Sequence, residues 1–585
     1  MHTIYNKSIL LCWLFLLAIT AVANTPSEAD FNKLTKTFIL NPDGSQEFRC
    51  SKELTLHSHP AMNSTYGETF IVYNPEFQKL VIHSSYTRMV DGTIVKTPDN
   101  AFNEVLPRFA AGAPAYNELK EMVVTHTGLE LGATIYLDYS VISKTGFYKK
   151  LDIDETLQES SPVKEYSVTI SVPEQTAMSY SLTGASGIKV VKNERKESGQ
   201  KLVSWTLKQV PASFHEPYMP ENNPAVPLLS ASTYSSRKDA LSSLNEGITK
   251  IRSLETETYA TYITDSLADN TQKISVILNH VLFGITYTPV PLEVTGYTVR
   301  EADEVLRSAY GTMAEKANLL VTMLRAINVP AEIVAVYPGT LESSVCGLNA
   351  IKELLVKTTL NGTNCYLPVI SNSASLLPFR GNLDVVCTLT GEQVEILPQQ
   401  VKTSASYDIN LSASEAKVKG IIVTTLNAFP MDYETVVKQW VGTNDAVIKR
   451  GENETITITF TVNKPVKIVN GYIIYKLPEL PYAAVQLNSK RSTIFEVPHL
   501  SDETSSYKIS LAPDLKLETP AATKTVNNEV GNFDLKITMN GSQVTVNRQC
   551  KLKLQQISPS LYPAFRSLSN ATESLQGREL IIEVK

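Results

Sequence analysis

The stretch Tyr310-Gly-Thr-Met-Ala-Glu-Lys-Ala-Asn-Leu-Leu-Val-Thr-Met-Leu-Arg-Ala-Ile-Asn-Val-Pro-Ala331 decides the fold of the central part of this chain. Its apolar residues recur at the spacing of one helix face, which predicts an amphipathic helix. The buried stripe is expected to consist of Ala317, Leu320, Met323, Leu324 and Ile327. A tight turn at Gly311 precedes this helix, and Asn328-Val-Pro330 ends it.

The head of this helix is a favourable place for a nucleophile, but the residue there is Met313. Free backbone N–H groups and a partial positive charge at a helix N-terminus lower the pKa of a thiol, and the thiolate is the reactive form. A methionine thioether cannot ionise and cannot give a proton to a base. The sequence therefore predicts an enzyme-like frame whose nucleophile position is chemically silent.

This segment resembles the transglutaminase-like superfamily, whose members share a papain-like α+β core. The superfamily motif contains a glycine, a spacer, the catalytic cysteine, an acid and lysine pair and a leucine-rich helix. Gly311, Glu315 and Lys316 match that motif, and Met313 occupies the position of the cysteine. The resemblance implies the fold, while the methionine puts the activity in doubt.

The resemblance also implies a catalytic histidine on one later strand and an aspartate on the next. We expect the first strand to run through Gly347-Leu-Asn-Ala-Ile351, which puts Asn349 at the histidine position. The next strand is expected to run through Asn364-Cys-Tyr-Leu-Pro368, with Pro368 at the aspartate position. All three catalytic positions, Met313, Asn349 and Pro368, are therefore predicted to be non-catalytic.

The histidines give an argument that does not depend on this alignment. The chain has eight, which are His2, His57, His59, His83, His126, His215, His280 and His499. His280 is the one that falls in the expected core domain, and it precedes Met313, so a Cys–His pair in the superfamily's order cannot be built. The alternative is a cysteine peptidase or amide-transfer enzyme with non-standard residues, because tertiary contacts could bring a histidine to a cysteine.

The flanks resemble one bacterial secreted family, in which such a core lies between two β domains of unknown function. The N-terminal likeness rests on Asp91-Gly-Thr-Ile-Val-Lys-Thr-Pro98, Glu104-Val-Leu-Pro-Arg-Phe109 and Val124-Thr-His-Thr-Gly-Leu-Glu-Leu-Gly132. The C-terminal likeness rests on Asn547-Arg548 and on Tyr562 to Leu568. The similarity spans nearly the whole chain and bears on architecture more than on activity.

The pattern of short alternating segments and turn signals agrees with that architecture, and we predict a multidomain α+β protein. Residues 24–230 are expected to form an N-terminal β-sandwich of two antiparallel sheets, with Trp205 in its core. Residues 231–385 are expected to form the transglutaminase-like (papain-like) α+β core. Residues 386–585 are expected to form a C-terminal β-sandwich-like domain.

The N-terminus has the pattern of a secretory signal peptide in residues 1–23. Lys7 is followed by an apolar stretch from Ile9 to Val22 and by the small-residue site Ala21-Val-Ala23. An uncleaved membrane anchor is the weaker alternative, because the stretch is short for a bilayer span of about 20 residues. We expect export to the periplasm, the cell surface or the medium, with no transmembrane segment after cleavage.

Composition restricts the partners and cofactors. A hydrophobic fraction of 43% and a charged fraction of 19% are typical of a folded globular protein. The net charge of -6 and the lack of a basic block make nucleic acid an improbable partner. No CxxC or HExxH motif supports a zinc site, and we expect no metal and no cofactor. His57, His59 and His83 are better explained as surface histidines than as metal ligands.

The cysteines do not form a dense disulfide framework. Cys12 leaves with the expected signal peptide, and the five others are widely spaced. One bridge among Cys346, Cys365 and Cys387 fits an oxidising compartment, but buried free thiols fit equally well. The disulfide pairing stays open at this point.

These observations favour an exported pseudoenzyme, a non-catalytic protein that serves as a binding or scaffold module in the cell envelope. Its partner would be a peptide, an envelope glycan or an envelope protein, and a purely structural assembly role is a further alternative. Tyr310, Gly311 and Glu315 are the candidate cleft residues. Glu315 and Lys316 could form a charged pair at that cleft, although Glu315 near a helix N-terminus also simply complements the helix dipole.

Overall fold

The computed structural model of the chain describes residues 27–220, 223–248, 253–339, 345, 347–360, 363–370, 384–394, 400–425, 437–438, 440–450, 455–479, 487–497 and 500–585. The expected signal peptide and Cys346 lie outside these residues. The chain divides into two compact units. The first consists of Met1–Lys149, Leu157–Thr176 and Ala185–Phe214, and the second of Lys150–Thr156, Ala177–Gly184 and His215–Lys585.

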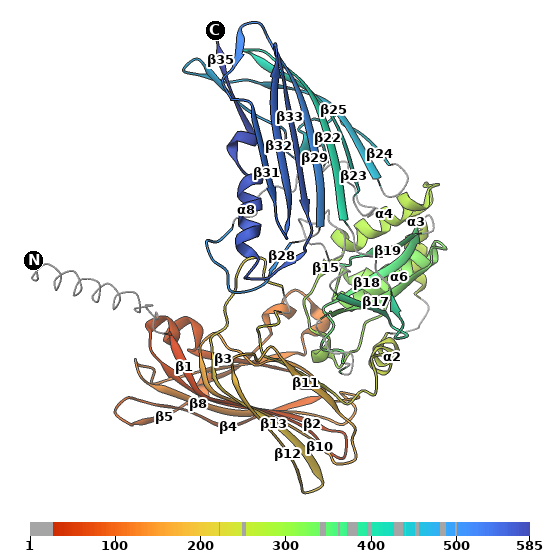
Figure 1. Ribbon diagram of the computed structural model, residues 1–585. Helices are drawn as coiled ribbons and strands as arrows, with labels where there is room; N and C mark the ends of the chain where they lie inside the picture. Colours follow the sequence, from red (N-terminus) through yellow and green to blue (C-terminus); the bar gives the residue numbers. More distant parts are fainter. Residues whose placement is uncertain are drawn as a thin grey trace, which may run out of the picture. The chain divides into compact units, whose positions relative to one another are not determined.

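The first unit contains one large and one small sheet (Figure 1). The large sheet has the order β12-β13-β10-β1-β2-β8-β4-β5. These strands are β1 (Ala29–Leu40), β2 (Gln46–Leu56), β4 (Gln78–Arg88), β5 (Ile94–Lys96), β8 (Thr134–Ser143), β10 (Val163–Pro173), β12 (Lys189–Glu197) and β13 (Gln200–Val210). The small sheet, in the order β3-β7-β6, contains β3 (Glu68–Tyr73), β6 (Phe102–Val105) and β7 (Lys120–Thr125).

The expectation of two purely antiparallel sheets is wrong for the large sheet. Strand β1 runs parallel to β10, from the pair Phe31 and Val163 to the pair Ile39 and Ser171. Alternation of apolar and polar residues predicts which face of a strand is buried but not which strand becomes its neighbour. The prediction for Trp205 is confirmed, because this side chain is buried on β13 opposite Val168.

Three strands from the expected N-terminal domain group with the second unit. They are β9 (Asp152–Thr156), β11 (Ser179–Thr183) and β14 (Leu228–Ser232), which form a sheet in the order β11-β14-β9. The strands are short and have their neighbours far along the chain. This sheet brings Asp152 into the same unit as the core domain.

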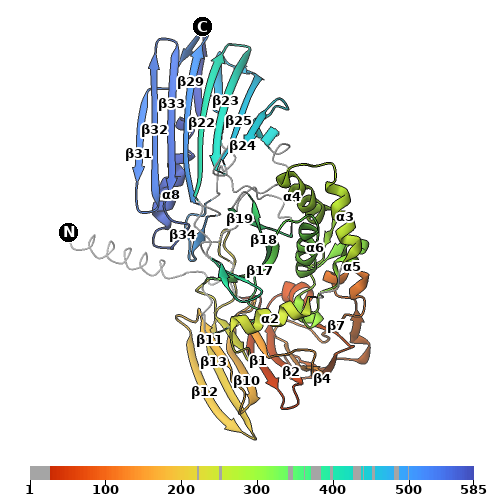
Figure 2. The same ribbon diagram turned by 90° about the vertical axis from the view of Figure 1, so that its right-hand side faces the viewer.

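The core of the second unit packs helices against a five-stranded sheet (Figure 2). The helices are α2 (Arg237–Gly247), α3 (Leu254–Thr264), α4 (Asn270–Asn279), α5 (Ala302–Ser308) and α6 (Met313–Ala326). The sheet, in the order β19-β18-β17-β20-β21, contains β17 (Ala331–Pro338), β18 (Glu353–Leu360), β19 (Thr363–Leu367), β20 (Asp384–Thr388) and β21 (Gln393–Val394). A short parallel pair joins β15 (Thr286–Tyr287) to β16 (Tyr310–Gly311).

Helix α6 lies at the centre of this core, as its sequence predicts. Leu320, Met323 and Leu324 are fully buried, and α6 packs against β17, β18, α3 and α5. Burial of a Leu or Met side chain contributes about 1.5–3 kcal/mol each. The stripe therefore fixes the position of the helix start.

The C-terminal part of the second unit is a second large mixed sheet (Figure 1). Its order is β24-β25-β23-β22-β29-β33-β32-β31, and β22 runs parallel to β29. These strands are β22 (Gln400–Leu411), β23 (Glu415–Thr425), β24 (Val447–Arg450), β25 (Thr455–Pro465), β29 (Leu500–Leu511), β31 (Ala522–Asn527), β32 (Gly531–Asn540) and β33 (Gln543–Leu552). The predicted hairpin at Asn540-Gly541 is confirmed as the turn between β32 and β33, with Gly541 at φ +61°.

One helix and two smaller sheets complete this part. Helix α8 (Tyr562–Thr572) packs against β31 and β32. A four-stranded sheet contains β26 (Ile468–Val469), β27 (Tyr472–Lys476), β30 (Leu515–Leu517) and β35 (Glu579–Val584), and β28 (Phe495–Glu496) pairs with β34 (Gln556–Ile557). Among the residues with described positions, no helix is long and apolar enough to cross a bilayer.

Candidate functional site

The start of helix α6 is closed by a capping box. Thr312 is the N-cap residue, and its Oγ1 accepts a hydrogen bond of 3.3 Å from the Glu315 backbone N–H. In return, Glu315 Oε2 accepts a hydrogen bond of 2.8 Å from the Thr312 backbone N–H. Two backbone donors that a helix start leaves unsatisfied are thus satisfied by side chains.

Arg300, which lies in the segment before α5, stabilises this capping box. Its Nε donates to Glu315 Oε1 at 2.8 Å and its Nη2 donates to Glu315 Oε2 at 3.0 Å, which is a bidentate ion pair. The same Nη2 donates to the Tyr310 carbonyl at 2.9 Å, and the guanidinium lies 4.7 Å from the centre of the Tyr310 ring. The Glu315 side chain is 1% exposed. The charge on Glu315 is therefore neutralised by Arg300 inside the protein.

Met313 is the first residue of helix α6, and its side chain lies against strand β18. Its sulfur accepts a hydrogen bond of 3.1 Å from the Leu354 backbone N–H on β18. Its carbon atoms are partly buried and pack against the core between the helices and the sheet. A thioether is a weak acceptor and has no proton to give. This contact holds the helix start against the strand and supplies no nucleophile.

The expected strand through Gly347 to Ile351 is wrong, because β18 begins at Glu353 and Asn349 lies in a turn. The carboxylate of Asp152 accepts hydrogen bonds from the backbone N–H groups of Leu348 and Asn349, the second at 3.0 Å. The Asn349 amide also donates to the Asp152 carbonyl at 3.0 Å. A residue far upstream therefore fixes this segment as a turn.

Asn349 is committed to structural contacts on both sides. Its Oδ1 accepts a hydrogen bond of 2.5 Å from the Tyr297 hydroxyl, while its Nδ2 bonds to the Asp152 backbone. Burial raises the pKa of Asp152 to about 6, against the opposite effect of the two backbone hydrogen bonds. An amide cannot act as a general base, so Asn349 positions this turn and moves no proton.

The predicted strand before Pro368 is confirmed, because β19 ends at Leu367 and Pro368 follows it directly. A proline at this position offers no carboxylate to orient an imidazole. His280 begins a π-helical turn that ends at Gly284, and its ring lies 5.0 Å from the Tyr259 ring. Burial lowers the pKa of His280, which favours the neutral imidazole.

Of the two interpretations of Glu315 and Lys316, a charged pair at a cleft is not found in the described contacts, because Lys316 points elsewhere. Its Nζ donates to the Ile285 carbonyl at 2.7 Å, and its side chain is fully buried. Burial lowers the Lys316 pKa to about 8. Gly311 is also buried, and a Cβ there would meet Val305 at 3.0 Å and Glu315 at 3.3 Å. Of the candidate cleft residues, Gly311 and Glu315 are therefore packed inside the helix start, and Tyr310 covers Arg300.

Sequence reasoning missed three residues of this arrangement, which are Arg300, Tyr297 and Asp152. The acidic residue at the third helical position is a signal for a capping box, whereas from the sequence alone Glu315 is interpreted as a cleft residue or as a complement to the helix dipole. Nothing in the local sequence indicates that the Glu315 carboxylate pairs with Arg300, 15 residues upstream. Likewise, nothing indicates that the Asn349 amide bonds to Asp152, 197 residues upstream. These contacts depend on tertiary structure.

Two of the three histidines considered as metal ligands have other side-chain contacts. His57 Nε2 lies 3.3 Å from the Asp30 carboxylate, and His83 Nε2 lies 2.8 Å from the Ser140 hydroxyl. Within the described part of the chain, no group of three His, Cys, Asp or Glu residues is placed to hold a metal ion. Cys50 and Cys550 are free thiols, and burial raises the pKa of both.

Three family models match the chain in the order of its parts. Residues 42–214 match DUF3857, a domain of unknown function with a solved structure. Residues 257–358 match the core of the transglutaminase-like superfamily. Residues 466–582 match DUF3858, another domain of unknown function with a solved structure. No protein with a curated description matches the chain.

One solved structure matches along almost the whole length. It is the crystal structure of a protein from Parabacteroides distasonis described as a "putative protease", with 44% sequence identity and a TM-score of 0.75. The match covers 95% of this chain and 99% of the other. A "putative cysteine protease" from Cytophaga hutchinsonii shares 13% identity over 38% of this chain and 75% of its own, with a TM-score of 0.18. Aminopeptidase A of Legionella pneumophila shares 8% sequence identity over 42% of this chain and 28% of its own, with a TM-score of 0.21. These two similarities are too weak to bear on the fold or the function of this chain.

Proposed function

Because this chain belongs to the transglutaminase-like superfamily, with its core between two β domains of unknown function, we propose that it is an exported pseudoenzyme that serves as a scaffold in the cell envelope. The localisation rests on the signal-peptide pattern of residues 1–23. The partner would be an envelope protein, a peptide or a glycan of that compartment.

The observation that carries this proposal is the contact between the Met313 sulfur and the Leu354 backbone N–H at 3.1 Å. Nucleophilic catalysis in this fold needs an ionisable group at the helix start and a base within hydrogen-bond reach. Met313 fills that place with a group that does not ionise, and it uses the strand as its partner. A fold can keep its packing after losing its chemistry.

The helix start is also filled in a way that favours a scaffold over a ligand cleft. Glu315 is 1% exposed and is held by Arg300, and Lys316 is buried against the Ile285 carbonyl. These charged side chains are engaged in contacts inside the domain, and this network stabilises it.

A second candidate is favoured by one comparison. The relative with 44% identity is described as a "putative protease", so peptide hydrolysis through non-standard residues is the alternative function. Such chemistry would need a thiol, and Cys365 on β19 and Cys387 on β20 are the described cysteines of the core. Amide transfer to an amine would use the same acyl-enzyme intermediate.

Turnover and thiol labelling test the proposal together. The purified protein is incubated with a fluorogenic peptide pool, with a primary amine as acyl acceptor, and with an iodoacetamide probe read by peptide mass spectrometry. We expect product at the level of the heat-denatured protein. Turnover that disappears after Cys346→Ser, Cys365→Ser or Cys387→Ser, at the cysteine that the probe labels, would overturn the proposal.

A further inference from the structure

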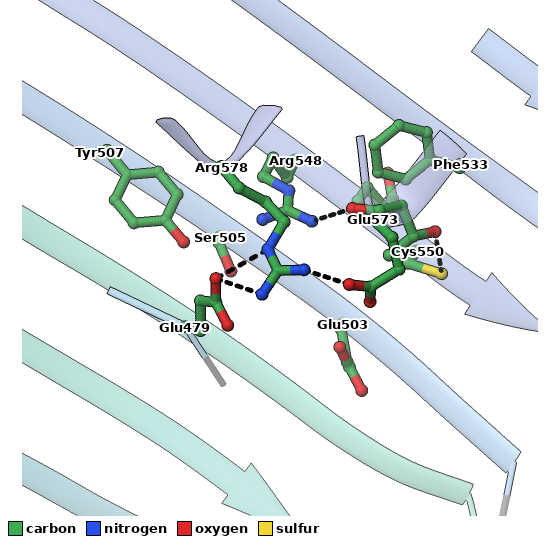
Figure 3. A pocket seen from close by; sticks show the side chains of 11 residues that line it. Glu479, Glu503, Ser505, Tyr507, Phe533, Arg548, Cys550, Glu573 and Arg578 are labelled. Atoms are coloured by element: carbon green, nitrogen blue, oxygen red, sulfur yellow. Dashed lines mark hydrogen bonds and ion pairs between the residues drawn. The ribbon is translucent and has the colours of Figure 1, made fainter. Parts of the chain in front are cut away.

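A polar cavity lies in the C-terminal domain, and none of its lining residues belongs to the helix start of the core (Figure 3). Its volume is about 90 Å³. A single ordered water needs about 10–15 Å³, so the cavity has room for a small molecule. Its walls come from the inner face of β29, β32 and β33 and from the segment that follows α8.

One part of the wall is an ion-paired group that is already satisfied. Arg578 Nε donates to Glu479 Oε1 at 2.7 Å, and Nη1 donates to Glu573 Oε2. One guanidinium thus neutralises part of the charge of two carboxylates. Figure 3 shows these pairs as dashed lines on one side of the cavity. They shape the cavity and leave a slight excess of negative charge.

The rest of the wall carries two charged groups, Glu503 and Arg548, that take no part in these ion pairs. Glu503 and Arg548 are on neighbouring strands, with Ser505 opposite Arg548 in the register of β29 and β33. Arg548 Nη2 donates to the Thr572 carbonyl at 2.8 Å, which caps the C-terminal end of α8. Arg548 also forms a side-chain hydrogen bond with Tyr507. A guanidinium has five N–H donors, so these two contacts leave donors for a ligand.

Glu503, in contrast to Arg548, needs a cation or hydrogen-bond donors as its partner. Within the described contacts, no hydrogen bond or ion pair engages its carboxyl group, and Figure 3 draws no dashed line from it to the other residues shown. Its burial raises the pKa to about 7, while the charge of Arg548 acts in the other direction. Glu503 is half-buried, and a carboxylate partly removed from water is stabilised when a cation or hydrogen-bond donors satisfy it.

We propose that this cavity binds a small zwitterionic α-amino acid, with its ammonium group on Glu503 and its carboxylate on Arg548. The two groups have opposite charge and line one cavity, which matches a ligand that carries both charged groups on one carbon atom. Arginine recognises carboxylates through its fork of N–H donors. The volume favours glycine or alanine over a large side chain. This inference is independent of whether the core domain is catalytic.

A ligand with only one charge fits the cavity less well. A simple amine would meet Glu503 but would also be repelled by Arg548. A simple carboxylate would meet Arg548 but would leave the half-buried Glu503 without a donor. A zwitterion satisfies both groups at once, so its affinity should exceed that of either half.

A ligand-observed NMR titration of the purified protein tests this proposal. The probes are L-alanine and glycine, with methylamine and acetate as the single-charge halves and L-tryptophan as the size control. We expect alanine and glycine to bind at millimolar concentration or below, and each half to bind at least about tenfold more weakly. Tryptophan should not compete for the cavity.

Variants identify the site. Glu503→Gln keeps the shape and removes the charge, and it should weaken alanine binding by about tenfold or more. Glu518→Gln removes an exposed carboxylate of the same domain, paired with Lys516, and should leave binding unchanged. Arg548→Lys keeps a cation without the bidentate fork and should weaken binding to an intermediate degree.

The pH dependence of alanine binding distinguishes a ligand contact of Glu503 from a purely structural role. Alanine binding to the wild-type protein should strengthen as pH rises through about 7, because Glu503 then ionises, and this dependence should vanish in Glu503→Gln. The proposal is overturned if glycine and alanine do not bind at millimolar concentration. It is equally overturned if Glu503→Gln and Glu518→Gln bind alanine alike.

Discussion

The ion pair between Arg300 and Glu315 should be a main stabilising contact of the core domain, and replacing Arg300 with methionine tests this. Methionine keeps an unbranched apolar side chain and removes the guanidinium. The change takes away two charge-assisted hydrogen bonds of 2.8 and 3.0 Å to the Glu315 carboxylate. It also removes the bond of 2.9 Å to the Tyr310 carbonyl.

The magnitude follows from burial. Glu315 is 1% exposed and Arg300 is 17% exposed, so the change leaves a buried carboxylate without its guanidinium. Breaking a buried pair by removing one partner costs about 3–5 kcal/mol. Arg307 and Glu255 form an ion pair of the same type on the surface, with 60% and 58% exposure. An exposed pair contributes about 0–1 kcal/mol, which makes Arg307→Met a matched control.

Hydrogen exchange measured by mass spectrometry suits a chain with several domains, because it reports local stability without assuming two-state unfolding. Peptides from helix α6 should lose about 3–5 kcal/mol of protection in Arg300→Met. A cycle with Glu315→Gln should then give a coupling energy of about 0.5–3 kcal/mol, because both groups belong to one pair. Equal effects of Arg300→Met and Arg307→Met on these peptides would refute the reasoning.

Three further predictions concern groups near this helix. Met313→Cys should create a thiol that iodoacetamide alkylates at neutral pH, while peptide turnover stays at background, because Asn349 and Pro368 at the expected partner positions supply no general base. Turnover in this variant would contradict this prediction. Asp152 ionises less readily folded (pKa about 6) than unfolded (3.8), so the folded state holds its proton more tightly. As pH rises from 3.8 to about 6, the wild type should therefore lose about 1–3 kcal/mol of stability relative to Asp152→Asn, as measured by calorimetry. Identical pH profiles of the two proteins would contradict a raised Asp152 pKa as the cause. Lys316 has a folded pKa of about 8 and an unfolded value of 10.5, so the unfolded state holds the proton more tightly; stability relative to Lys316→Met should rise with pH between these values, and a fall would contradict burial as the cause.

The sequence predicted the central helix and many of the strands because their signals are local. The stripe of Leu320, Met323 and Leu324 is buried as expected, and the turn at Asn540-Gly541 closes a hairpin. Trp205 lies in the core of its sheet. In each of these cases, neighbouring residues in the chain contain the necessary information.

The parts that were not predicted depend on distant contacts. Gly347 to Ile351 contains apolar residues that favour a strand, but Asp152 holds this segment as a turn through two backbone N–H groups. The parallel pairs of β1 with β10 and of β22 with β29 were also missed, because alternation does not specify the neighbouring strand. Glu315 was expected near a cleft, whereas Arg300 draws it into the interior.

The most direct test of the central claim is a turnover measurement on the wild-type protein beside its Cys346→Ser, Cys365→Ser and Cys387→Ser variants. The substrates are a peptide pool for hydrolysis and a labelled amine for amide transfer. With Met313 bonded to the Leu354 amide in place of a nucleophile, the account predicts that all four proteins release product at the background rate. Wild-type turnover that one of these serine substitutions abolishes would contradict it.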